Sequence, residues 1–212
     1  MSDAVTVPRT GVCPGAPPDL APLRGFVRQL AEITGSGRRE SEILAAARPV
    51  LAGLVTHDDW LPDAWATPNP DHYQQYLLHC DSRARFSVVS FVWGPGQATP
   101  THNRRVWGLV GILRGAEQAQ RYRRTRDGLV AEGPPEILRP GDVDAVSPRL
   151  GDIHRVSNAL PDAVSVSIHV YGGDIGAIER ATFASDGTAE RFVSGYADRP
   201  LPNIWRQEPP IN

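Results

Sequence analysis

The feature that most constrains the fold of this chain is a series of short β-branched and aromatic runs that begins after residue 75. Glycine- and proline-containing turns separate these runs, and no helical pattern comes between them. Strands at this spacing predict an all-β sandwich or barrel. The runs are RFSVVSFVWG (85–94), VWGLVGILRG (106–115), AQRYRRT (119–125), DVDAVS (142–147) and AVSVSIHVYG (163–172).

Two segments with the apolar spacing of an α-helix precede the strands. Apolar residues recur at helical spacing from Leu20 to Leu30 and again from Ile43 to Leu54, with the helix-ending sequence GSG between them at 35–37. A chain of 212 residues fits one domain. We therefore expect a flexible leader over 1–19, an N-terminal helical segment over 20–72, and a β-barrel with a C-terminal tail over 73–212.

Composition excludes several function classes. The net charge is −2, and the most basic stretch, RYRRTR (121–126), is predicted to be a solvated strand face rather than a nucleic-acid patch. No apolar run approaches the roughly 18 residues that a membrane span needs.

Because Cys13 lies in a Pro/Gly-rich leader, a disulfide to Cys80 is not expected, and a reducing cytoplasm is the simplest location. Oligomeric state is left open.

Two glycine-histidine patterns carry the chemistry. The first reads Gly96-x5-His102-x-Arg104-x3-Gly108-x6-Gly115, and the second reads Gly151-x2-His154-x3-Asn158. A spacing of two residues on a strand puts both side chains on the same face, so the first pattern aims positions 102 and 104 at one target. A distant strand can then supply a further side chain to the same place.

The two patterns resemble the paired signatures of the cupin superfamily, whose first signature normally reads G-x5-H-x-H-x3,4-E-x6-G. The resemblance implies a mainly β fold, a single cupin (double-stranded β-helix or jelly-roll) barrel with an N-terminal helical segment. It also implies that His102 and His154 are metal ligands. Arg104 stands where a second histidine ligand is usual, and a core histidine held by hydrogen bonds is the alternative for each imidazole.

Residues 73–206 further resemble the thiol dioxygenases, namely cysteine dioxygenase and, more closely, bacterial 3-mercaptopropionate dioxygenase. Glycine at position 108, where other cupins place a carboxylate ligand, is one feature of this resemblance. Another is Ser167-x-His169-x-Tyr171, which looks like the Ser-His-Tyr relay of that family.

The same resemblance assigns two residues to substrate binding. Arg180, nine residues after Tyr171, sits where the mercaptopropionate enzymes place a carboxylate-binding arginine, and Gln75 lies near the position of a glutamine in those enzymes. A surface strand arginine is the alternative for Arg180. Gln74 competes with Gln75 for its role.

The relay pattern also makes chemical sense without the resemblance. Alternation in SVSIHVY places Ser167, His169 and Tyr171 on one face of a strand. A tyrosine hydroxyl held by a histidine can donate to a bound molecule and shuttle a proton. The alternative is an amphipathic strand with a solvated polar face.

The resemblance implies Fe(II), or another divalent metal, as cofactor. It implies a small thiol carboxylate (3-mercaptopropionate or cysteine type) and O2 as partners, and oxidation of the thiol to a sulfinate. Arg104 cannot be a neutral ligand, because guanidinium has no acceptor and stays protonated. Three hypotheses follow: a metal-dependent thiol dioxygenase, a cupin rebuilt for other oxidative chemistry on a cysteine-like substrate in specialised metabolism, or a non-catalytic cupin that binds a small molecule.

Overall fold

The structure is a computed structural model that describes residues 19–149, 151, 153–197 and 203–205. Apart from Asp19, the predicted leader over 1–19 lies outside these residues, as do parts of the predicted tail. The boundaries drawn at 20–72 and 73–212 stay predictions.

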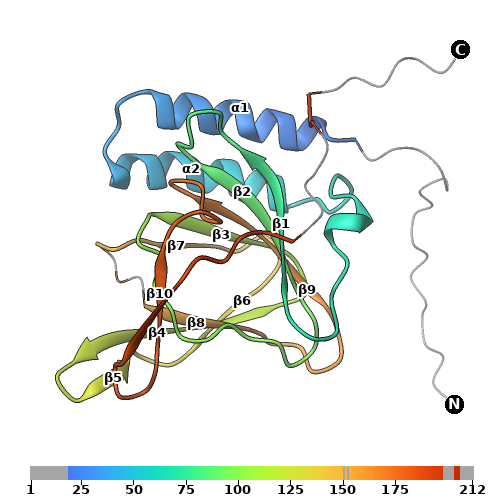
Figure 1. The fold of residues 1–212 in the computed structure, drawn as a ribbon. Helices are drawn as coiled ribbons and strands as arrows, with labels where there is room; N and C mark the ends of the chain where they lie inside the picture. Colours follow the sequence, from blue (N-terminus) through green and yellow to red (C-terminus); the bar gives the residue numbers. More distant parts are fainter. Residues whose placement is uncertain (1–18, 150, 152, 198–202, 206–212) are drawn as a thin grey trace, which may run out of the picture.

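The barrel is built from antiparallel strands in two facing layers (Figure 1). The first layer is a five-stranded sheet with the order β1-β2-β9-β3-β7. Its strands are β1 (Gln74–Cys80), β2 (Ser87–Trp93), β3 (Gly108–Arg114), β7 (Val143–Val146) and β9 (Ser165–Tyr171). Among these, β9 lies at the centre; it pairs with β2 along its whole length and with β3 from Val166 to Tyr171.

The second layer is assembled around β4, which pairs with β5, β6 and β8, and it also contains the hairpin of β10 and β11. The strands are β4 (Glu117–Thr125), β5 (Gly128–Ala131), β6 (Glu136–Leu138), β8 (His154–Asn158), β10 (Arg180–Phe183) and β11 (Ala189–Phe192).

A stretch that we call the bridging segment, residues 98–104, joins the two parts of this layer. His102 forms isolated bridges both to His154 of β8 and to Thr182 of β10. Its backbone exchanges two hydrogen bonds of 3.0 Å with His154. The first glycine-histidine pattern is thereby brought directly beside the second.

Two helices lie side by side along the outer face of the first layer (Figure 1). These are α1 (Ala21–Gly35) and α2 (Glu40–Val55), and a short 3-10 turn, η1 (Asp63–Trp65), follows. A Cβ added at Gly111 of β3 would lie 3.0 Å from side-chain atoms of Leu51 and Val55. The missing side chain therefore allows α2 to pack closely onto the sheet.

Alternation along β2 separates two hydrophobic clusters. Val88 and Val92 belong to the larger cluster beneath the helices, whereas Val89, Phe91 and Trp93 belong to a smaller cluster inside the barrel. All seven residues of β2 are buried because the strand is covered on both faces. The functional site lies within the second of these two compartments.

The predicted fold class, a mainly β double-stranded β-helix barrel with an N-terminal helical segment, is confirmed. Both predicted helices are present, and the five predicted runs form β2, β3, β4, β7 and β9. None of the helices in the described part of the chain is long and apolar enough to cross a membrane. The described part of the tail returns to the helices, where Ile204 is buried and its carbonyl accepts a hydrogen bond from Arg24.

Candidate functional site

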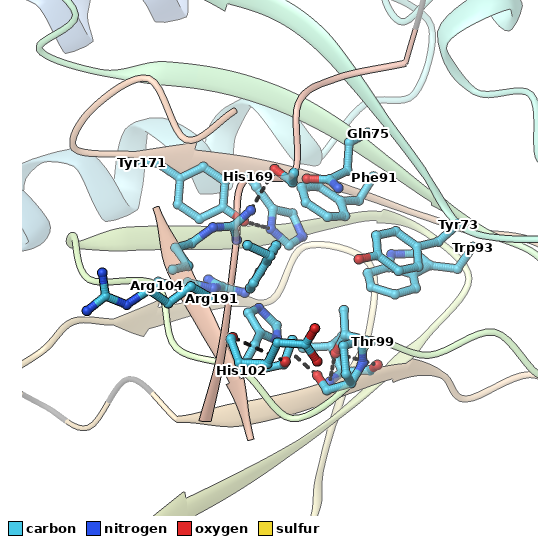
Figure 2. A pocket seen from close by; sticks show the side chains of 17 residues that line it. Tyr73, Gln75, Phe91, Trp93, Thr99, His102, Arg104, His169, Tyr171 and Arg191 are labelled. Atoms are coloured by element: carbon cyan, nitrogen blue, oxygen red, sulfur yellow. Dashed lines mark hydrogen bonds between the residues drawn. The ribbon is translucent and has the colours of Figure 1, made fainter. Parts of the chain in front are cut away.

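A cavity of about 400 Å³ opens between the two layers of the barrel. Six of the eight site residues predicted from the sequence line this cavity: Gln75, His102, Arg104, His169, Tyr171 and Arg180. Figure 2 shows His169, Tyr171, Gln75 and Phe91 on one side and His102 with Thr99 on the other. Ser167 lies behind His169, and His154 lines a neighbouring smaller pocket that also contains Arg104.

The predicted relay is present as a continuous hydrogen-bonded chain along β9. Ser167 Oγ lies 2.8 Å from His169 Nε2, and His169 Nδ1 lies 2.8 Å from the hydroxyl of Tyr171. All three side chains are buried, with exposed fractions of 1% or less. The alternative of a solvated polar face is therefore wrong, because this face of β9 points into the barrel.

Burial controls the protonation of the relay. It lowers the pKa of His169 well below its usual range, with the positive charge of Arg104 acting in the same direction. Burial also raises the pKa of Tyr171, against the opposing effects of Arg104 and Arg180. Near neutral pH the relay therefore consists of a neutral imidazole and a protonated phenol, and the phenol can donate a hydrogen bond into the cavity.

The two candidate ligand histidines lie together. Their ring centroids are 4.6 Å apart at an interplanar angle of 61°. His102 Nδ1 lies 3.0 Å from the carbonyl oxygen of Pro100, which can only accept, so Nδ1 carries the proton and Nε2 keeps its lone pair. Burial and then the charge of Arg104 lower the pKa of His102 to about 3. This imidazole is therefore neutral and oriented as a metal ligand would be.

Arg104 points into the barrel and is 2% exposed. Its Cζ lies 5.3 Å from the ring centroid of Tyr171. Its Nε and Nη1 have no hydrogen-bond partner among the residues that the structure describes. The spacing of two residues predicted that Arg104 shares a target with His102, and in the structure both line the same cavity.

The residues present do not fit a three-histidine iron centre. His102 and His154 supply two imidazoles, but the described residues contain no group of three His, Cys, Asp or Glu side chains that could hold a metal ion. A guanidinium within ~4 Å of a divalent cation would oppose binding by about 8 kcal/mol at an effective dielectric constant of about 20. Arg104 thus removes a ligand and adds a repulsive charge.

Arg180 is buried at the start of β10 and is not a surface arginine. Its Nη2 donates a hydrogen bond of 2.6 Å to Ser194 Oγ. The guanidinium packs on the ring of Phe192, its partner across the β10–β11 hairpin, at 4.7 Å. Its Nε has no partner in the described part of the chain. The side chain of Arg180 is therefore held in place, and its Nε donor is unused within the described residues.

Gln75, and not Gln74, lines the cavity. The Gln74 side chain instead donates to the carbonyl of His72. The buried Oε1 of Gln75 has no partner among the described residues. Of the two candidates, Gln75 is therefore the one placed to contact a ligand.

An aromatic wall and a buried carboxyl group were not predicted from the sequence. Tyr73 stacks on Trp93 with centroids 4.8 Å apart, and Phe91 stacks on His169 at 4.0 Å. Alternation in SFVW could have revealed Phe91 and Trp93 as one inward face. Burial raises the pKa of Glu117 to about 7, opposed by its hydrogen bonds to serine hydroxyls and by Arg104. No motif in the sequence pointed to this residue.

Gly108 has a packing role in this site. A Cβ at this position would lie 3.1 Å from the carbonyl oxygen of Val170 and 3.2 Å from Cδ1 of Tyr171. A larger residue at this position would displace the tyrosine at the end of the relay.

No family model matches this chain. Solved structures with a similar arrangement include a protein with a double-stranded β-helix domain from Klebsiella pneumoniae. It is 16% identical to this chain with a TM-score of 0.41, and the match covers 62% of this chain and 87% of that chain. Another is a cupin-superfamily protein from Desulfitobacterium hafniense, with 16% identity, a TM-score of 0.39, and coverage of 58% and 88%. A cupin 2 domain-containing protein from Halorhodospira halophila has 16% identity, a TM-score of 0.39, and coverage of 56% and 74%. Similarities of this size carry no information about function, which rests on the geometry of the site.

Proposed function

We propose that the barrel cavity binds a small thiol carboxylic acid, of the 3-mercaptopropionate or cysteine type, with its carboxylate at Arg180. The observation that carries this proposal is the buried guanidinium of Arg180, which is 4% exposed and has an unused Nε donor beside the cavity. A buried, incompletely paired charge is unfavourable, and an anionic ligand would offset that cost. Guanidinium also matches a carboxylate in shape.

The rest of the cavity suits a short carbon chain with a polar end. Tyr73, Phe91 and Trp93 provide an apolar wall for methylene groups. The hydroxyl of Tyr171 can donate a hydrogen bond to the far end of the ligand, and His169 fixes the direction of that hydroxyl. Gln75 offers an amide for one further polar contact.

A second candidate function is the iron-dependent oxidation of the bound thiol by one O2 to a sulfinic acid, as the resemblance to thiol dioxygenases implies. The intact Ser167–His169–Tyr171 chain favours it, because such a chain holds and returns a proton beside the substrate. The ligand set does not favour it, because Arg104 replaces an imidazole. We therefore rank binding above oxidation.

Isothermal titration calorimetry of the full chain tests the binding function. We expect 3-mercaptopropionate to bind and 1-propanethiol, which lacks the carboxylate, to bind at least tenfold more weakly. Arg180→Met should lose at least tenfold in affinity for the acid. The matched control Arg155→Met removes an exposed arginine of β8 and should stay within threefold of the parent protein. Equal binding of the acid and the neutral thiol would contradict the proposal.

Metal content and oxygen uptake test the second candidate. The protein is loaded anaerobically with Fe(II), desalted, analysed for iron, and then exposed to O2 with 3-mercaptopropionate or cysteine. We expect well under one retained iron per chain and no thiol-dependent oxygen uptake. Uptake of one O2 per thiol with sulfinate as the product would establish the dioxygenase instead, and any other oxidised product would favour the rebuilt chemistry.

A further inference from the structure

The cavity contains a second buried guanidinium that the binding of one carboxylate does not use. Arg104 lines the same cavity as Arg180 and is 2% exposed. No carboxylate among the described residues lies within 4.0 Å of it, since it takes part in none of the ion pairs found there. Both its Nε and its Nη1 are buried without a hydrogen-bond partner in that part of the chain.

The two guanidinium groups are close enough to influence one another. The pKa of Arg180 is lowered by burial first, and the positive charge of Arg104 adds to this effect. One buried carboxyl, Glu117, shares the smaller neighbouring pocket with Arg104. Even when fully ionised, Glu117 balances only one of the two positive charges. The interior of the barrel is therefore positive by at least one charge from these three groups.

Aromatic rings hold both guanidinium groups in place. Arg104 lies against the Tyr171 ring with Cζ 5.3 Å from its centroid, and Arg180 lies against the Phe192 ring at 4.7 Å. The contacts restrict the orientation of each group, while N–H donors of each remain unused. A guanidinium can donate in parallel to the two oxygens of an oxyanion, a geometry that a single sulfur atom does not match.

We propose that the ligand of this cavity is a short-chain dianion, with a carboxylate at Arg180 and a second oxyanion, carboxylate or sulfinate, at Arg104. This rests on the part of the proposed function that places a carboxylate at Arg180, and it assigns a second oxyanion, in place of a thiol, to the Arg104 end of the cavity. The hydroxyl of Tyr171, packed against Arg104, provides an additional donor for the second oxyanion. A thiol acid would then bind more weakly than a diacid or a sulfinate acid of similar length.

Calorimetry with four probes tests the inference: succinate and 3-sulfinopropionate as dianions, and propionate and 3-mercaptopropionate as monoacids. We expect both dianions to bind at least 30-fold more tightly than propionate. Arg104→Met should reduce that ratio to below threefold, while Arg180→Met should weaken all four ligands. Arg104→Lys keeps the charge without the fork and should give an intermediate ratio. Arg155→Met should change none of the affinities by more than threefold.

The outcomes separate this inference from the function on which it rests. If propionate and succinate bind equally while both depend on Arg180, the dianion inference is wrong and the binding function stands. If none of the four acids binds, the proposed function itself is wrong. A succinate affinity at least tenfold above that of 3-sulfinopropionate identifies a dicarboxylate site, and the reverse order identifies a sulfinate site. Far-ultraviolet circular dichroism and the melting temperature of each variant establish that it is folded.

Discussion

The two walls of the cavity differ in how completely their polar groups are paired. On β9, Ser167, His169 and Tyr171 form an unbroken chain with both ring nitrogens of the histidine engaged at 2.8 Å. On the opposite wall, the bridging segment presents Arg104 with two buried N–H donors that have no partner among the described residues. The hydrogen bonds of the β9 wall are made within the protein, whereas Arg104 has two donors without a partner in the described part of the chain.

This difference indicates which wall determines what the protein binds. A buried network whose members are all paired keeps its geometry without a ligand. A buried guanidinium with unused donors is stabilised by any group that supplies oxygens and negative charge. Under the dianion proposal, the β9 wall provides a fixed surface with one donor hydroxyl, and Arg104 selects the charge of the ligand.

Converting the charged wall into a metal site should give the largest effect. Arg104→His restores a third imidazole beside His102 and His154 and removes the repulsive charge. We expect the affinity for Co(II) or Fe(II) to rise at least 100-fold, measured by equilibrium dialysis and by the visible spectrum of the Co(II) form. Thiol-dependent oxygen uptake should rise with Fe(II) occupancy.

Arg105→His is the matched control for this change. It introduces a histidine at the next position, where the side chain is exposed and makes an ion pair with Glu179. Its metal affinity should equal that of the parent protein. If Arg104→His also leaves metal affinity unchanged, position 104 does not face the histidines as the structure places it.

Neutralising the buried carboxyl near Arg104 should change the pH dependence of stability. Burial raises the pKa of Glu117 from 4.5 to about 7, so the folded protein keeps a proton that the unfolded chain releases above pH 4.5. The contribution of this group to stability is complete below pH 4.5 and is lost as the pH rises to about 7. At about 1.4 kcal/mol for each pH unit, the full loss is about 3 kcal/mol.

Glu117→Gln should remove this pH-dependent loss of stability. Urea unfolding at pH 5 and at pH 8 measures it, and the variant should gain stability relative to the parent protein at pH 8. The opposite contributions of His169 and His102, whose pKa values are lowered, are present in both proteins and cancel in the difference. A constant difference between the two proteins across this pH range would show that Glu117 is ionised throughout.

The contrast between the walls also limits what the sequence could predict. Both helices and the five predicted runs were found because apolar periodicity and turn residues are local signals. The relay was found because alternation places Ser167, His169 and Tyr171 on one face. These features depend on the order of residues within a single element.

Features that depend on contacts between distant elements were not predicted. The runs that form β8, β10 and β11 were not identified as strands, because each has only four or five residues and so carries little alternation of its own. The spacing of His102 and Arg104 predicts a shared face, but it does not show which groups lie opposite. Glu117 follows a glycine turn in an ordinary strand, and its burial arises only when the two layers close over it.

Removing the unpaired charge should stabilise the fold. Arg104→Met keeps a long side chain in the same space and eliminates a guanidinium that is buried without a carboxylate within 4.0 Å in the described residues. Replacing buried charges by apolar groups of similar volume is often neutral or stabilising by ~1–4 kcal/mol, and we expect about 2 kcal/mol here. Thermal and urea unfolding without ligand measure it. Destabilisation by a similar amount would mean that Arg104 is paired within the protein, and the dianion inference would lose its basis.

Breaking the complete wall should have the smallest effect, because only neutral hydrogen bonds are lost, one of them long at 3.4 Å, and no charge is exposed. Ser167→Ala removes the partner of His169 Nε2, which lies 2.8 Å away, and it also removes the acceptor of the Trp93 indole N–H at 3.4 Å. A buried neutral hydrogen bond contributes about 1 kcal/mol, so we expect a loss of about 1 kcal/mol in urea unfolding. The affinity for the tightest-binding acid should stay within threefold, because Arg104 and Arg180 are untouched. If that affinity falls tenfold or more, the relay helps to position the ligand, and the division of roles between the two walls is wrong.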